Sequence, residues 1–235
     1  MELQDVVDRL EAMGSERTKR TYFRHGVREP FFGVKIGDLK KLVPAVKKNQ
    51  PLALALYDTG IHDAMYLAGL SVDPKRMAKE RLQAWASQAY WYVLAEYTVA
   101  GVAAESPHAL ELAREWMESD GEMIACAGWS AYAHYMSVAP DERLDPDEIR
   151  SLLDRVARTV HQERNRVRYN MNGFVIAAGA FVAELHEEAI RVAETIGKVR
   201  VDVGETACKV PVAADAIRGV AAAGRVGVKK KTCIC

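Results

Sequence analysis

The chain has 235 residues and is 49% hydrophobic, which suffices for one large domain or a short array of repeats with a continuous core. Lysine plus arginine and aspartate plus glutamate each number 32, so the net charge gives no bulk signal for nucleic acid or a membrane. The signs are nevertheless separated. Residues 17–48 are rich in bases, residues 105–148 are acidic, and Lys229–Lys231 make the C-terminus basic. A neutral chain with this separation can carry a strong local field.

The N-terminus, the apolar runs and the cysteines bear on the compartment. Residues 1–10 have the pattern of an amphipathic helix with acids, unlike a signal peptide. No apolar run approaches the roughly 18 residues that a membrane span needs. The last four residues are not a prenylation box, because Thr232 stands where its cysteine would be. We therefore expect a cytoplasmic protein with free thiols and no membrane partner. Cys233 and Cys235 are left without an assigned role.

Taken in order, the chain reads as a series of helices. Apolar periodicity, caps and glycine or proline stops predict helices over 3–13, 15–23, 37–48, 52–58, 61–70, 75–84, 108–118, 122–136, 148–161, 166–182, 184–196 and 210–223. Pro44 falls within the third of them and is expected to kink or shorten it. Residues 198–203 alternate like a strand but have no partner strand, which favours an extended loop. The sequence thus predicts one all-α domain over 1–223 and a disordered basic tail over 224–235.

The segment from Trp85 to Tyr97 has five aromatic residues in little more than three helical turns, with no glycine or proline. Apolar residues recur around most of its circumference, which is typical of a helix buried among others. It follows directly on the helix that begins at Lys75 and is expected to continue it. One charge, Glu96, lies inside the segment. Glu96 is either a core carboxylate paired with a Tyr or Arg of a neighbouring helix, or a functional acid whose apolar setting raises its pKa.

The chain contains an internal echo. Tyr57 falls on Trp116 and Gly69 on Gly128, at the same offset of 59 residues. Each copy reads as a helix, a turn, and a helix with an Ala-Gly pair where another backbone can approach closely. The offset exceeds the about 40 to 47 residues usual for helical-pair repeats because the aromatic segment lies between the copies. Tandem helical hairpins form a curved solenoid with a concave binding face, which is the architecture we predict.

Three stretches carry a resemblance to a known family. They are Phe31-Phe-Gly-Val-Lys-Ile-Gly-Asp-Leu-Lys-Lys-Leu42, Leu56-Tyr-Asp-Thr-Gly60 followed by His62-Asp-Ala-Met-Tyr-Leu-Ala68, and Trp116-Met-Glu-Ser119 before another helix. In their order and spacing they resemble the DNA alkylation repair proteins, which are built from HEAT-like helical repeats. The resemblance runs from about residue 20 to about residue 195 and implies an α-α superhelix with a positively lined concave face that holds DNA by its backbone.

The resemblance also implies a chemistry, and here the chain departs from the family. Active members excise alkylated purines such as 3-methyladenine and 7-methylguanine with an aspartate that stabilises the cationic sugar, flanked by two tryptophans and an arginine. The family's Trp-Trp-Asp-x-x-Asp falls on residues 90–95, so Ala95 occupies the catalytic position. Residues 123–128, which should supply the arginine, contain none, and Phe174 is the nearest aromatic to the other tryptophan. Only Glu96 could replace the carboxylate, although one position along a helix is about 100° of rotation.

Candidate DNA contacts follow from the resemblance and from basic clusters. The expected set is Trp91, Tyr92, Lys35, Lys40, Lys41, Arg164, Arg166, Arg168, Asn172, Lys229 and Lys230. Arginines at the start of a helix suit phosphates, and an amide such as Asn172 within an apolar helix needs a polar partner or a groove. A solvated face, a buried aromatic core and a solubilising tail are the structural alternatives. The six histidines lie apart, so we expect no metal and no cofactor.

The sequence therefore predicts a DNA-binding repeat protein whose partner is duplex, damaged or branched DNA. We expect recognition through the backbone with weak or no glycosylase activity. In the alternative, an active alkylpurine glycosylase, Trp91 would contact the lesion-bearing nucleotide and Glu96 would stabilise the sugar cation. A protein-interaction scaffold is the rival from another class, because the architecture also binds peptides and the net charge is zero. A monomer is the expected state.

Overall fold

The computed structural model describes residues 1–234, and every regular element among them is a helix. The α-helices are α1 (Leu3–Met13), α2 (Glu16–Arg24), α3 (Ile36–Leu39), α4 (Val43–Val46), α5 (Gln50–Asp58), α6 (His62–Ser71), α7 (Lys79–Gln88), α8 (Ala100–Ala104), α9 (Ala109–Met117), α10 (Glu122–Val138), α11 (Pro146–Thr159), α12 (Asn165–Phe181), α13 (His186–Ile196) and α14 (Ala213–Ala222). The 3₁₀-helices are η1 (Pro74–Arg76), η3 (Asp141–Arg143), η4 (Val160–Gln162) and η5 (Ala183–Leu185), and η2 (Leu94–Val99) is a π-helix. The predicted all-α architecture is confirmed.

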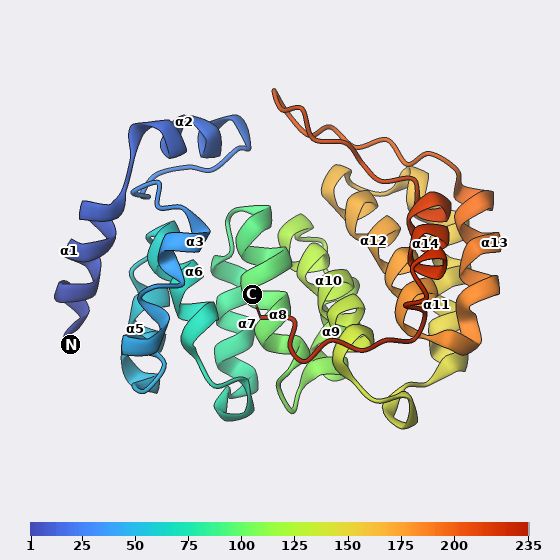
Figure 1. Ribbon diagram of the computed structural model, residues 1–235, viewed down its shortest axis with the longest axis horizontal. Coiled ribbons are helices and arrows are strands. Elements are labelled where there is room, and N and C mark those ends of the chain that lie inside the picture. Colours follow the sequence, from blue (N-terminus) through green and yellow to red (C-terminus); the bar gives the residue numbers. More distant parts are fainter. Residues whose placement is uncertain (235) are drawn as a thin grey trace.

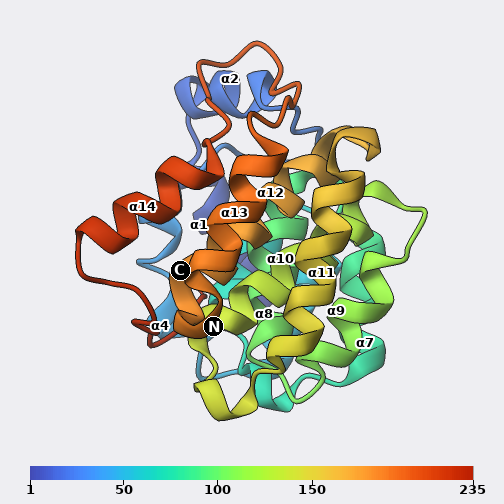
Figure 2. The ribbon, with the colours of Figure 1, turned by 90° about the vertical axis from the view of Figure 1, so that its right-hand side faces the viewer.

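The helices stack as antiparallel pairs along the long axis of the molecule (Figure 1). The pairs are α5 with α6, α7 with η2 and α8, α9 with α10, α11 with α12, and α13 with α14. Contacts between successive pairs run from α6 to η2, from α8 to α10, from α10 to α12 and from α12 to α14, so these second helices form one layer. The view turned by 90° shows α9 and α11 side by side on the other layer (Figure 2). This is the superhelix that the tandem pattern predicts.

Glycines allow neighbouring helices to approach closely at two places in the stack. A Cβ at Gly128 would lie 2.5 Å from the backbone nitrogen of Met117, so α9 and α10 touch backbone to backbone. At Gly69 the close neighbour is the Thr98 side chain, 2.5 Å from the Cβ position, and η2 packs there. The close approach of another backbone that the echo predicts is therefore found at Gly128, whereas at Gly69 the close neighbour is a side chain.

The aromatic segment is not one continuous helix, and that prediction is wrong. Helix α7 ends at Gln88, residues 89–91 turn, and a second helix begins at Tyr92. The turn is fixed by tertiary bonds that no local pattern encodes. The Tyr57 hydroxyl donates to the carbonyl of Trp85 (2.8 Å), and its ring stacks on that indole with centroids 3.9 Å apart. The Trp91 indole N–H donates to the His25 carbonyl (2.7 Å). These contacts tie the end of α7 to α5 and the turn to the residue that follows α2.

A buried carboxylate holds the loop between α2 and α3. Asp63, at the start of α6 and without exposed surface, accepts backbone N–H bonds from Phe32 (2.6 Å), Gly33 (3.4 Å) and Val34 (2.7 Å). The loop in turn fixes the direction of α2. Beyond it, Pro44 separates the expected helix over 37–48 into α3 and α4, as its missing N–H predicts.

Residues 224–234 pack against the helices, contrary to the expected disordered tail, and Cys235 lies outside the described residues. From α14 it runs back beside α12 and α10 to α8 (Figure 1). The Lys229 ammonium donates to the carbonyls of Met136 (3.0 Å) and Phe181 (2.6 Å), at the ends of α10 and α12. The Cys233 N–H donates to Glu105 (2.7 Å), and its side chain is buried. Carbonyls at the ends of two helices lack partners within their own helices, so they accept from the lysine. This contact depends on tertiary structure and cannot be predicted from a run of basic residues.

Candidate nucleic-acid interface

A groove of about 500 Å³ lies where the second helices begin. Its walls come from the end of α2, the turn before η2, the first residues of α10 and α12, and the loop between α13 and α14. Segments far apart in the sequence therefore share one concavity. Three of the expected contact residues, Trp91, Tyr92 and Arg166, line it.

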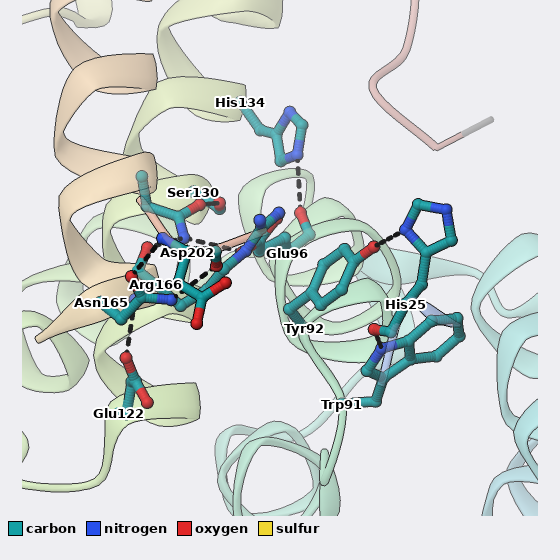
Figure 3. Close-up of polar contacts among 11 residues, drawn as sticks. His25, Trp91, Tyr92, Glu96, Glu122, Ser130, His134, Asn165, Arg166 and Asp202 are labelled. Atoms are coloured by element: carbon teal, nitrogen blue, oxygen red, sulfur yellow. Dashed lines mark hydrogen bonds and ion pairs between the residues drawn. The ribbon is translucent and has the colours of Figure 1, made fainter. Parts of the chain in front are cut away.

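The groove floor joins α2 to the aromatic turn. Trp91 is only 4% exposed, and its indole packs edge-on against His62 with ring centroids 4.7 Å apart. The Tyr92 hydroxyl lies 3.1 Å from Nδ1 of His25, and the His25 carbonyl accepts the Trp91 indole N–H (Figure 3). Trp91 thus presents an edge to the groove while most of its surface stabilises the end of α2.

Arg166 is held on every side. Its guanidinium lies between the rings of Tyr92 and Tyr169, 3.9 and 4.0 Å from their centroids. Its Nε and a terminal nitrogen donate to the two carboxylate oxygens of Glu96, at 2.5 and 2.7 Å (Figure 3). Its backbone N–H donates to Glu122 at 2.7 Å. A planar, bidentate and stacked arginine is well organised as a cross-link between η2 and α12.

Glu96 is 2% exposed and belongs to the core. Asn170 also donates to its carboxylate (2.9 Å), and the Ser130 hydroxyl donates to the Asn170 side-chain oxygen (2.5 Å). Burial raises the pKa of Glu96, and the bonds from Arg166 and Asn170 offset part of that rise. Ala95, at the family's catalytic position, is fully buried. The carboxylate therefore serves a polar network between helices.

His62 lies under Trp91 in an aromatic cage. The rings of Tyr22 and Tyr66 lie 5.6 and 6.0 Å from it, and its Nδ1 has no hydrogen-bond partner among residues 1–234. Burial lowers its pKa from 6.5 to about 3. The fold therefore holds this histidine neutral, because a charged imidazolium would lose its hydration.

This burial predicts a pH-dependent stability. Because the folded pKa of His62, about 3, lies below the unfolded 6.5, its contribution is complete above pH 6.5 and is lost as the pH falls. The loss should approach about 1.4 kcal/mol per pH unit within that window. Urea unfolding at pH 7, 6 and 5 measures it, and His62→Leu should flatten the dependence. Leu67→Val, in the same helix, should lower stability equally at each pH; an unchanged pH slope in His62→Leu would contradict this assignment.

The other expected contacts on α12 are engaged within the protein. Arg164 donates to the carbonyls of Ser119 (2.9 Å) and Asp120 (2.5 Å). Arg168 donates to the Asn165 side chain at 3.2 Å and is half-buried. Asn172 is buried and donates to the Pro211 carbonyl at 3.0 Å, which ties α12 to the segment before α14. These contacts hold the three side chains within the protein, and Nε of Arg168 and Oδ1 of Asn172 have no hydrogen-bond partner among residues 1–234.

The expected lysines lie outside the groove lining. Lys35, Lys40 and Lys41 are exposed, and Lys41 pairs with Asp38 at 2.7 Å. Lys229 caps two helices and pairs with Asp141 at 2.9 Å. Lys230 is exposed above the Phe181 ring, at the edge of a separate cavity of about 220 Å³.

Several groove residues were absent from the expected set. They are Phe23, Arg24, His25, Tyr97, Cys208 and Lys209. Phe23 and Tyr97 are 51% and 46% exposed. An exposed phenylalanine inside the basic helix over 16–24 was a signal available in the sequence. No sequence signal pointed to Cys208 and Lys209, because only the path of the loop before α14 brings them near α2.

Neither a metal-binding cluster nor a membrane-spanning helix is found among residues 1–234. Within residues 1–234, no group of three His, Cys, Asp or Glu side chains is placed to hold a metal ion. None of the helices in that range is both long enough and apolar enough to cross a bilayer. What the groove offers instead is aromatic surface beside cations.

Comparison with known proteins shows which family the chain belongs to. Residues 6–200 match the profile of a family described as DNA alkylation repair enzyme. The chain belongs to this family. It is similar to uncharacterised proteins of Listeria innocua serovar 6a (strain ATCC BAA-680 / CLIP 11262) and Listeria monocytogenes serovar 1/2a (strain ATCC BAA-679 / EGD-e). Each is 35% identical over 208 residues, covering 86% of this chain and 89% of the relative.

A solved structure matches over 100% of both chains, with a TM-score of 0.92 and 36% identity. It is described as a new family of proteins related to the HEAT-like repeat DNA glycosylases with affinity for branched DNA structures. The HEAT-like fold inferred from the resemblance is thereby confirmed, and so is the membership of the repair family.

Proposed function

We propose that this family member binds distorted or branched DNA through backbone contacts and does not excise bases. The solved relative with affinity for branched DNA supports the ligand. The observation that carries the proposal is the Glu96–Arg166 pair, which occupies the one carboxylate next to the family's catalytic position. A carboxylate held in a bidentate ion pair and 2% exposed cannot approach a sugar at the DNA surface.

The cations that support binding lie on α2. Arg17, Arg20 and Arg24 are exposed, spaced at three and four residues, and form no ion pair within residues 1–234. Helical spacing places them on one face of this short helix, and the last of them, Arg24, lines the groove. Such a face suits phosphates, which accept from guanidinium groups without reading sequence.

Binding is tested with a four-way junction and a linear duplex of matched length, by fluorescence anisotropy at several salt concentrations. We expect tighter binding to the junction, with affinity falling about a hundredfold between 50 and 200 mM salt if four phosphates are contacted. Arg17→Ser with Arg20→Ser should reduce the slope of log affinity against log salt by up to about 2. A salt-independent affinity would contradict the proposal.

The matched control is Arg158→Ser with Arg191→Ser, two exposed arginines on α11 and α13 of the other layer. This control changes the net charge equally and should leave the salt slope unchanged. The same loss in both variants would point to bulk charge instead of α2.

The enzymatic alternative has its own measurement. Incubation with methylated duplex DNA should release no free 3-methyladenine or 7-methylguanine above the rate without protein. Release that disappears in Glu96→Gln, with folding intact by circular dichroism, would establish glycosylase activity and overturn the proposed absence of excision.

A further inference from the structure

The loop between α13 and α14 closes one side of the groove. Asn165 fixes it at the start of α12, donating to the Asp202 carbonyl (2.8 Å) and accepting the Asp202 N–H (2.7 Å). At its tip a Cβ on Gly204 would lie 3.2 Å from the Arg24 carbonyl, so the loop meets the end of α2. Both ribbon views show it reaching toward that helix (Figures 1 and 2).

The groove beside this loop is small. Its volume of about 500 Å³ falls within the range of about 300–1,000 Å³ that holds small molecules. A double helix does not enter a space of this size while the loop touches α2. A single DNA strand is slender enough to enter it. The size therefore selects unpaired nucleotides over paired ones.

The chemistry of the walls agrees with the size. Phe23 projects from α2 with half of its surface exposed, and Tyr97 is exposed to nearly the same degree on η2. Arg24 and Lys209 line the same space and form no ion pair within residues 1–234. Aromatic rings that stack on bases, alternating with cations that follow the phosphates, are the elements of single-strand binding sites.

We infer that the groove holds an unpaired stretch of a DNA strand, with bases against Phe23 and Tyr97 and phosphates near Arg24 and Lys209. This inference rests on the proposed function and deepens it. A branched DNA offers such a stretch where its arms separate, while a blunt duplex does not. Recognition of branches then comes from the groove, and the exposed arginines of α2 contact the adjoining phosphates.

A native thiol reports on occupancy of the groove. Cys208 is exposed and lines the groove, whereas Cys126 and Cys233 are buried. The full-length protein is alkylated with iodoacetamide in the presence of a ten-nucleotide oligothymidylate, a forked duplex or a blunt duplex, and modification at Cys208 is read by peptide mass spectrometry. We expect the first two DNAs to slow its alkylation and the blunt duplex to leave it unchanged.

Affinity for the same three DNAs tests the aromatic contacts. Phe23→Ala and Tyr97→Ala should each weaken oligothymidylate and fork binding about five- to a hundredfold and leave duplex binding within twofold. The control Tyr135→Ala removes an aromatic on α10 outside the groove lining and should change neither. Fork binding that survives both substitutions with Cys208 unprotected would overturn this inference and leave the proposed function standing. Failure to bind any of the three DNAs at low salt would overturn both.

Discussion

Replacing Arg166 with methionine is expected to lower the free energy of unfolding by about 3–5 kcal/mol, because it leaves the Glu96 carboxylate buried without its partner. For a chain of this length the melting temperature should fall by about 10 °C. The stacked position between Tyr92 and Tyr169 adds to the loss, since methionine does not reproduce the cation–ring contact. Thermal and urea unfolding measure both quantities.

The pH dependence of this variant distinguishes an ion pair from simple packing. Burial already raises the pKa of Glu96, and removing the guanidinium raises it further. A group whose folded pKa exceeds its unfolded value favours folding at low pH and opposes it as the pH rises. The destabilisation by Arg166→Met should therefore be smaller at pH 5 than at pH 8.

Two comparisons control the experiment. Glu96→Met combined with Arg166→Met removes both charges and should recover much of the lost stability. Arg218→Met breaks a half-exposed ion pair with Glu194 and should cost no more than about 1 kcal/mol. If Arg166→Met costs as little as Arg218→Met, the pair is not a structural cross-link, and Glu96 becomes available for other roles.

Asp63→Ala is expected to lower the free energy of unfolding by a similar amount, about 3–5 kcal/mol, because three backbone N–H groups in the loop after α2 lose their acceptor. Asp63→Asn should cost nearly as much, since an amide oxygen can accept at only one side of the site. Amide hydrogen exchange over residues 31–34 should accelerate together with that of α2. Urea unfolding and exchange mass spectrometry provide the two readouts.

The control for Asp63 is Asp147→Ala, whose side chain is 92% exposed and forms an exposed ion pair with Arg150. It should change stability by no more than about 1 kcal/mol. An Asp63→Ala protein with unaltered exchange in the loop would show that the carboxylate does not fix this segment. If the substitution loosens α2 and leaves α5 to α13 intact, DNA affinity should also fall. Such a result would connect the loop to the proposed function.

Periodicity located most helices because each buries one apolar face, and that requirement is written locally. Helix breaks caused by proline or glycine, such as the one at Pro44, could also be predicted from the sequence. The break at residues 89–91 was not, because it depends on Trp91 donating to the His25 carbonyl, 66 residues away. The prediction of a disordered tail was wrong for the same reason, because Lys229 donates to carbonyls on α10 and α12.

The candidate site shows the same division. The sequence singled out Trp91, Tyr92 and Arg166, and the fold brings them together in the groove. It did not reveal that Glu96 would meet Arg166 across 70 residues, nor that Phe23 and Lys209 would face one space. Residues so far apart in the sequence meet only because the superhelix packs their helices together, and no sequence spacing indicates such pairs.

By itself, then, the sequence determined an all-helical chain of tandem pairs, its family resemblance, and alanine at the family's catalytic position, since helix formation and motif order are local properties. The tertiary structure alone decided what surrounds Trp85 to Tyr97. It divided that segment into two helices, buried Glu96 against Arg166, and closed the groove with a loop that meets α2. Pairing of charges and enclosure of space depend on how whole helices pack, so neither could be derived from the residues in line.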